Sequence, residues 1–266
     1  MGARYYICLK LRRGKKVKQS ILVHKHPFII ASTKRGLNLR KMALDKHFFK
    51  KSYGIILVCL SVTVLIGVCI PLLSLNSVEC VIISELQNLT QRTIGIPFFM
   101  VFTYLGDFTL WIAFSVTFFI YTFFKSRKHF RTSVQLIFYL ALVTVSTYLL
   151  KEVFTRPRPD SAGITIYSEE TFFGIPLQGG LLADLSSFSY PSGHVSRAAG
   201  SLLVFSGKRS TTKTALIAAA IAVLSLSRIV LGLHYPTDVI GAIPLSLAMV
   251  EVTGIVIARA HLSSLI

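Results

Sequence analysis

The feature that most constrains this chain is a set of apolar segments, each about as long as a membrane is thick. Three of them contain no charged residue: residues 54–75, 108–124 and 132–150. Lipid offers the backbone no hydrogen-bond partner, so a chain crosses the roughly 30 Å of hydrocarbon as a helix of about 20 apolar residues. These segments predict an all-α, polytopic membrane protein.

Three later segments are also apolar but carry ionisable residues: residues 192–207, 214–233 and 238–258. A charged side chain at the centre of a membrane helix costs roughly 2.5–3.5 kcal/mol on insertion scales, so such residues need a partner or a function. Together the six segments predict a bundle of six transmembrane helices. The first segment follows about fifty residues of chain, which indicates a retained anchor and not a cleaved signal peptide.

The net charge of +18 is concentrated in segments that would lie on one side of the membrane. Of the 29 Lys and Arg residues, 15 precede the first predicted span. If that end is cytoplasmic, residues 125–131, 208–213 and the C-terminal tail are cytoplasmic too, which places 23 of the 29 on one side. This agrees with the positive-inside rule and predicts that both termini are cytoplasmic. The expected membrane is the cell membrane or that of the endoplasmic reticulum. This distribution also indicates that the basic residues serve membrane topology, and that the chain does not bind nucleic acid.

The chain divides into a basic N-terminal arm, residues 1–51, and a membrane domain, residues 52–266. The arm could bind anionic headgroups, or it could be only a topology signal or a disordered extension. A further hypothesis is that translation starts at Met42, because residues 42–51 already supply a basic flank. The cysteines Cys8, Cys59, Cys69 and Cys80 lack metal-ligand or paired spacing, so we expect no disulfide, metal or cofactor.

Polar residues that carry chemistry gather at three places along the membrane domain. Lys151 ends the third predicted span, and Arg156 and Arg158 follow it. Ser192, Gly193 and His194 open the fourth span, and Arg228, His234 and Asp238 lie between the fifth and the sixth. With both termini cytoplasmic, all three places fall on the extracytoplasmic or lumenal face. The topology therefore predicts one shared site there.

The residue types at this predicted site indicate phosphate chemistry. Lys151, Arg158 and Arg228 would repel one another unless an anion lay between them, and a phosphate group accepts bonds from several cations. Backbone amides at the start of the fourth helix would add a favourable dipole. His234, held by Asp238 four residues on, is suited to attack phosphorus, and His194 to transfer protons.

The spacing of these residues resembles the type 2 phosphatidic acid phosphatase and vanadium haloperoxidase superfamily. Six residues separate Lys151 from Arg158, Pro191 precedes Ser192 to His194, and Arg228, His234 and Asp238 keep the third motif's intervals. The resemblance implies a metal-independent membrane lipid phosphatase. It makes His234 the nucleophile, Asp238 its orienting partner and His194 the general acid and base. Its implied phosphate ligands are Lys151, Arg158, Ser192, Gly193 and Arg228.

Arg197 lies one helical turn after His194, and two interpretations of it stay open. It could contact a second phosphate of a diphosphate substrate, or it could pair with Asp160 or Asp184. Arg at this spacing is similar to members that act on isoprenoid diphosphates, which favours a polyprenyl diphosphate over phosphatidylglycerophosphate or phosphatidate.

Other functions are compatible with the same residues. A lipid phosphotransferase would use the same site with an alcohol in place of water. A non-catalytic transporter or anion-binding protein would need the cations but not His194, His234 and Asp238. The expected partners are a lipid phosphate and the bilayer, with no nucleic acid; the sequence does not predict an oligomeric state.

Overall fold

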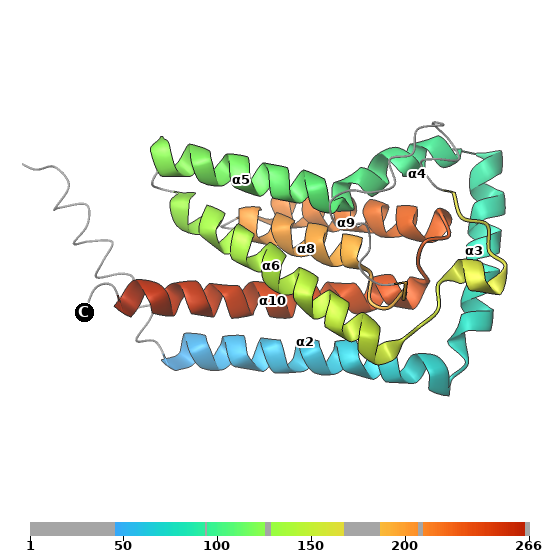
Figure 1. The fold of residues 1–266 in the computed structure, drawn as a ribbon, viewed down its shortest axis with the longest axis horizontal. Coiled ribbons are helices and arrows are strands. Elements are labelled where there is room, and N and C mark those ends of the chain that lie inside the picture. The colour runs from blue at the N-terminus through green and yellow to red at the C-terminus, as the bar shows by residue number, and fades with distance from the viewer. Residues whose placement is uncertain (1–45, 94, 126–128, 168–186, 207–209, 264–266) are drawn as a thin grey trace, which may run out of the picture. The chain divides into compact units, whose positions relative to one another are not determined.

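The computed structural model describes residues 46–93, 95–125, 129–167, 187–206 and 210–263, and the regular elements of this part are all helices (Figure 1). This confirms the predicted all-α class. In chain order they are α2 (Lys46–Leu72), α3 (Leu75–Arg92), α4 (Ile96–Thr103), η1 (Tyr104–Gly106), α5 (Phe108–Phe124), α6 (Phe130–Phe154), η3 (Pro159–Ala162), α8 (Gly193–Ser206), α9 (Thr211–Val230) and α10 (Pro236–Ser263).

Each of the six predicted segments corresponds to one helix, but the helices differ in their capacity to span a membrane. Helices α2, α6, α9 and α10 are long and apolar enough, and α4 with α5 qualifies as one span bent by 44°. Helix α8 has 14 residues, which at 1.5 Å per residue gives about 21 Å. The chain is an integral membrane protein, while six full spans stay a prediction.

Helix α8 differs from the other helices in how little of it is exposed. Most of its residues are buried, and many are small: Ser196, Ala198, Ala199, Gly200 and Ser201. Figure 1 shows it among α5, α6, α9 and α10. Because protein surrounds α8, its polar residues are not set against lipid, and it need not match the full thickness of the hydrocarbon.

Tyr139 of α6 shows how closely α8 is packed. Its hydroxyl donates a 2.6 Å hydrogen bond to the carbonyl of Ser196, which also accepts a 3.1 Å bond from the Ser246 hydroxyl of α10. A side chain at Gly200 would overlap the Tyr139 ring and hydroxyl. The carbonyl of Ser196 therefore joins α6, α8 and α10, and the absence of a side chain at Gly200 leaves room for Tyr139.

Helix α3 crosses one end of the bundle at a steep angle to the other helices (Figure 1). Its buried residues are Glu79, Ile83, Gln87 and Thr90, so three of the four are polar, whereas Val78, Val81 and Leu89 are exposed. The Gln87 amide donates to the carbonyls of Val230, at 3.0 Å, and Thr165, at 2.8 Å. Helix α3 thus binds the end of α9 through its polar face.

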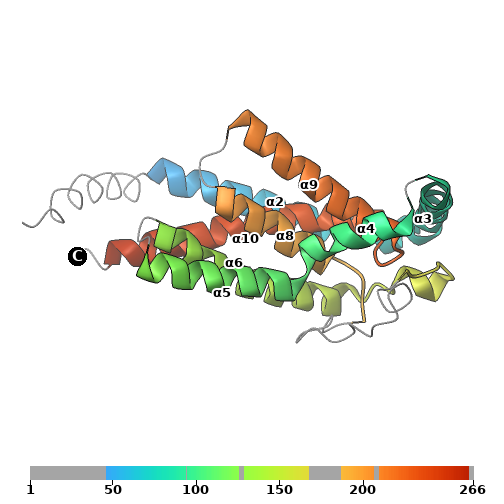
Figure 2. The same cartoon turned by 90° about the horizontal axis from the view of Figure 1, so that it is seen from above.

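Helix α9 packs mainly through its last turns. Its buried residues, Leu224, Ser227, Arg228 and Val230, all lie in the second half, and Figure 2 shows the helix diverging from α8 toward its first residue. The end that carries Arg228 is therefore held firmly against the rest of the protein.

Most of the predicted basic arm, residues 1–45, lies outside the described residues, together with Met42 and Cys8. Helix α2 begins at Lys46, so the helix of the first span starts inside the segment assigned to the arm by composition.

We predict that Gly200→Ala destabilises the protein by about 1–3 kcal/mol, the usual cost of overpacking a filled core. The added methyl group would overlap Tyr139. Thermal unfolding in detergent measures the effect. Gly54→Ala is the matched control, because no atom lies within 4 Å of a side-chain carbon there. Equal stability of the two variants would contradict the packing of α6 against α8.

Candidate active site

The end of α9 determines where His234 lies. The amide of Leu233 donates to the carbonyl of Arg228 at 3.1 Å, and that of Gly232 to Ile229 at 3.0 Å, which is the bond pattern of a Schellman motif. Gly232 has a φ of 73°, and a side-chain carbon there would collide with the carbonyl of Thr165. Only glycine meets both demands, so the turn that presents His234 depends on it.

The start of α10 determines the position of Asp238. Pro236 is the first helical residue, and the carboxylate of Asp238 reaches back to accept a 2.9 Å bond from the amide of Tyr235. This is the reciprocal contact of a capping box. The main-chain carbonyl of Asp238 accepts a 3.0 Å bond from the amide of Ser192, so the start of α8 is tied to the start of α10.

His234 and Asp238 form a buried pair. Both are fully buried, and Nδ1 of His234 lies 3.3 Å from Oδ2 of Asp238. Nε2 of His234 is buried and makes no hydrogen bond to any described residue. Burial lowers the pKa of His234 to about 4, with the charges of Arg228 and Arg158 acting in the same direction and the contact with Asp238 opposing it. At pH 7 the imidazole is therefore neutral and, with Nδ1 donating to Asp238, Nε2 has a lone pair.

The beginning of α8 adds donors near this pair. Ser192 is fully buried, and its hydroxyl makes no hydrogen bond to the described part of the chain. His194 is half-buried, and its Nδ1 lies 3.4 Å from Nη2 of Arg197. A side chain at Gly106 would come within 2.7 Å of Cβ of His194, so η1 closely approaches α8 here. The imidazole of His194 therefore lies beside the guanidinium of Arg197 at the start of α8.

The three cations predicted as phosphate ligands come from three elements. Lys151 is buried in the last turn of α6. Arg228 is buried near the end of α9, and its Nη1 donates a 2.6 Å bond to Oγ1 of Thr103 in α4. Arg158 follows α6 in an extended segment and donates from Nε to the carbonyl of Ser187 at 3.2 Å. The charges of Arg228 and Arg158 both lower the pKa of His234, so both cations are near enough to act on its ring.

Arg197 lies over the start of α8. A side chain at Gly193 would meet its Nη1 at 3.0 Å, and its guanidinium carbon lies 5.3 Å from the centre of the Phe108 ring. Of the two carboxylates considered as its partners, Asp184 lies outside the described residues, and Asp160 is exposed and accepts a bond from the amide of Ser161.

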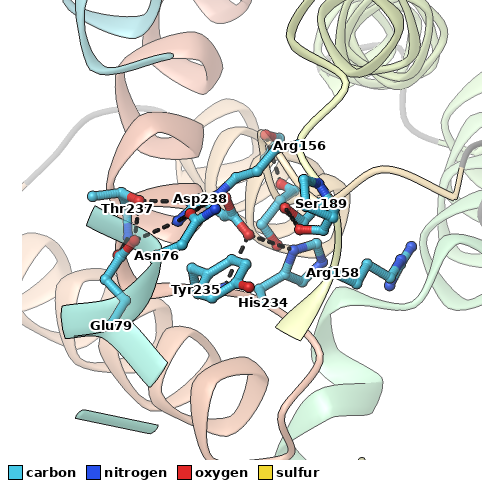
Figure 3. A network of polar contacts seen from close by, with 12 residues as sticks. Asn76, Glu79, Arg156, Arg158, Ser189, His234, Tyr235, Thr237 and Asp238 are labelled. Atoms are coloured by element: carbon cyan, nitrogen blue, oxygen red, sulfur yellow. Dashed lines mark hydrogen bonds and ion pairs between the residues drawn. The ribbon is translucent and has the colours of Figure 1, made fainter. Parts of the chain in front are cut away.

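The structure adds three residues around Asp238 that the sequence did not single out, Asn76, Glu79 and Thr237 (Figure 3). It also gives partners to Arg156, which the sequence placed at the site without a role. Arg156 forms ion pairs with Asp238, at 2.6 Å, and with Glu79 of α3. Figure 3 shows Arg156 and His234 reaching Asp238 from different sides. The sequence does show a second arginine two residues before Arg158. Its spacing along the chain, however, does not predict which carboxylates it contacts.

The sequence predicts neither a metal site nor a disulfide. Within the described residues there is no group of three or more His, Cys, Asp or Glu side chains that could hold a metal ion. Cys59, Cys69 and Cys80 are free thiols there.

Comparison with known proteins identifies a family and a fold. Residues 132–260 match the model of the PAP2 superfamily. The crystal structure of a transmembrane PAP2-type phosphatidylglycerolphosphate phosphatase from Bacillus subtilis matches with a TM-score of 0.60 and 21% sequence identity, over 75% of this chain and 94% of that one. At this identity the likeness shows the fold. No curated protein sequence gives a significant match.

We predict that lowering the pH from 6.5 to 4 destabilises the protein in part through His234. In that window the unfolded chain binds a proton at this residue and the folded protein does not, because burial lowers its pKa from 6.5 to about 4. One such proton changes stability by up to about 1.4 kcal/mol per pH unit, and the loss is absent above pH 6.5. In thermal unfolding, His234→Asn should reduce this pH dependence; an unchanged slope would contradict a neutral, buried His234.

Proposed function

This chain belongs to the PAP2 superfamily through its residues 132–260, and we propose that it is a lipid phosphatase in which His234 attacks phosphorus. The observation that carries the proposal is the His234–Asp238 pair. One ring nitrogen faces a carboxylate, and the other is buried, neutral and unbonded among the described residues. This arrangement is that of a nucleophile held in one tautomer by an acidic partner.

In the first step Nε2 of His234 forms a bond to phosphorus, and the bond between phosphorus and the leaving lipid oxygen breaks. His194 gives a proton to that oxygen, while Asp238 stabilises the positive charge that develops on His234. In the second step His194 takes a proton from water, the water oxygen bonds to phosphorus, and the bond to Nε2 breaks. The products are inorganic phosphate and the lipid with one phosphate fewer, which for a diphosphate is the lipid monophosphate.

The phosphate would be held by Lys151, Arg158 and Arg228, by the Ser192 hydroxyl and by the amides of Gly193 and His194. Ser192 supports this because its hydroxyl is buried without a hydrogen bond to the described residues. The charge of the cations suits an anion with three peripheral oxygens. The chemistry uses no metal ion in any step.

The distribution of Lys and Arg favours an extracytoplasmic or lumenal site, because it places the loops at the opposite end of the spans in the cytoplasm. The substrate would then lie in the outer leaflet with its tail among the helices and its headgroup at His234.

A polyprenyl diphosphate is the substrate we propose. Arg197 supports this choice, because its guanidinium lies beside Gly193 and His194, whose amides would bind the reacting phosphate. A second phosphate there would be neutralised by Arg197. A lipid phosphotransferase is the alternative, and acceptor-dependent product in place of inorganic phosphate would identify it.

We predict that His234→Ala lowers phosphate release by more than about 10³-fold, because the nucleophile is lost. Release would be measured in detergent with a chelator present, across polyprenyl diphosphate, phosphatidylglycerophosphate and phosphatidate. His129→Ala, at an exposed histidine before α6, is the matched control and should keep full activity. Activity in His234→Ala, or a strict requirement for magnesium, would refute the mechanism.

We also predict that Arg197→Gln lowers kcat/KM for a polyprenyl diphosphate about 10-fold or more, and lowers it less for the corresponding monophosphate. The reason is that only the diphosphate has a second phosphate for the guanidinium to bind. Steady-state kinetics on both substrates measures the difference. Equal losses on the two substrates would show that Arg197 does not select for the diphosphate.

A further inference from the structure

We propose that Glu79 and Arg156 act as a positioning pair that holds Asp238 in the orientation that His234 needs. This inference rests on the proposed function, since it concerns the same nucleophile. Neither residue would touch the substrate.

The guanidinium of Arg156 is fully used by protein atoms. Nε donates to Oδ1 of Asn76 at 3.1 Å, and Nη2 donates to the same oxygen at 2.7 Å and to Oε2 of Glu79. Nη1 donates to Oγ1 of Thr237 at 2.7 Å and to Oδ1 of Asp238 at 2.6 Å. An arginine has five N–H donors, and these five contacts use all of them.

This environment separates Arg156 from Arg158, although the two are only two residues apart. Arg156 is 4% exposed, and its guanidinium also lies 3.9 Å from the centre of the Tyr235 ring. With no donor left for a phosphate, it is suited to hold a carboxylate and not to bind substrate. Arg158 is half-buried and acts on His234 from the other side.

The two oxygens of Asp238 have separate partners. Oδ1 accepts from Arg156, while Oδ2 faces Nδ1 of His234 at 3.3 Å and accepts from the amide of Tyr235 at 2.9 Å. Rotation of the carboxylate would break both sets of contacts. Arg156 therefore restricts Asp238 to the orientation in which Oδ2 meets the imidazole.

Glu79 has two effects on this arrangement. It balances the charge of Arg156, so that the negative charge of Asp238 is not neutralised by Arg156 alone and stays available to a phosphorylated His234. It also accepts from the amide and hydroxyl of Thr237, at 2.7 and 3.0 Å, and Thr237 is the neighbour of Asp238 in the first turn of α10. Glu79 thus positions Asp238 both through Arg156 and through the backbone.

The pair also connects the site to an element outside the family segment. Glu79 lies in α3, whereas the PAP2 match begins at residue 132. Helix α3 also exposes Val78, Val81 and Leu89. The orientation of Asp238 therefore depends on a helix that crosses the end of the bundle and that holds none of the site residues predicted from the sequence.

The test compares Glu79→Gln, Arg156→Met, Arg156→Lys and the double variant Glu79→Gln/Arg156→Met. Rapid acid-free quenching of the enzyme mixed with radiolabelled farnesyl diphosphate, or with short-chain phosphatidate if that is turned over faster, measures the rate at which phosphohistidine forms. Steady-state kinetics on the same substrate gives kcat and KM. Glu85→Gln is the matched control, being the same change at an exposed position of the same helix.

We expect Arg156→Met to slow phosphohistidine formation and kcat about 10- to 100-fold, by analogy with the loss seen when the hydrogen-bond partner of a metal-ligating residue is removed. KM should change by less than about 3-fold, since substrate contacts remain. Arg156→Lys should recover part of the rate. Glu79→Gln should lower it about 10-fold alone and little in the Arg156→Met background, because residues that act as a unit are not additive.

The outcomes separate the two proposals. If the wild-type protein forms no phosphohistidine and His234→Ala is active, the proposed function fails. If the wild-type forms it and both Arg156→Met and Glu79→Gln form it at the rate of Glu85→Gln, the positioning pair is refuted and the proposed function stands. If Arg156→Met does not fold, the test is the rate of phosphohistidine formation in the nearly isosteric Glu79→Gln, compared with Glu85→Gln. A fall in kcat with a matching rise in KM would also count against positioning.

Discussion

Three parts of the chain meet at the carboxylate and carbonyl of Asp238, and a fourth is connected to it through Arg156. Its side chain contacts Arg156, which follows α6, and His234 and Tyr235, which precede α10, while its carbonyl accepts from Ser192 at the start of α8. Arg156 extends the contact to Glu79 of α3. Buried charges cost several kcal/mol each unless they are paired and hydrogen-bonded. The elements at this end of the bundle are therefore held in one arrangement, because separating them would leave a buried charge without its partner.

The position of α8 explains how a polar site is kept inside a membrane protein. A helix with buried Arg197 and several serines would be poorly placed in lipid. Surrounded by α5, α6, α9 and α10, it can be short, and its small residues let Tyr139 and Ser246 bond to its backbone. Its first residues then face the turn that carries His234, so close packing of the bundle brings backbone amides to the candidate site.

The two arginines after α6 have different environments. Arg156 is enclosed by carboxylates, a threonine and an asparagine, whereas Arg158 acts on His234 from outside this group. The prolines that follow each of them prevent a helix and give an extended segment, in which side chains two residues apart need not face the same partners. One short segment thereby supplies a structural ion pair and a candidate phosphate ligand.

The sequence by itself determined the helices, the membrane and the catalytic candidates. Hydropathy and the spacing of Arg228, His234 and Asp238 are properties of short stretches of chain, so they can be interpreted without knowing the fold. Only the tertiary structure decided that α8 is enclosed and short, that α3 crosses the end of the bundle, and that Arg156 pairs with Glu79, 77 positions away. Such pairings depend on which distant surfaces are buried against each other. Hydropathy does not distinguish two arginines two residues apart, and only packing shows which one faces a carboxylate.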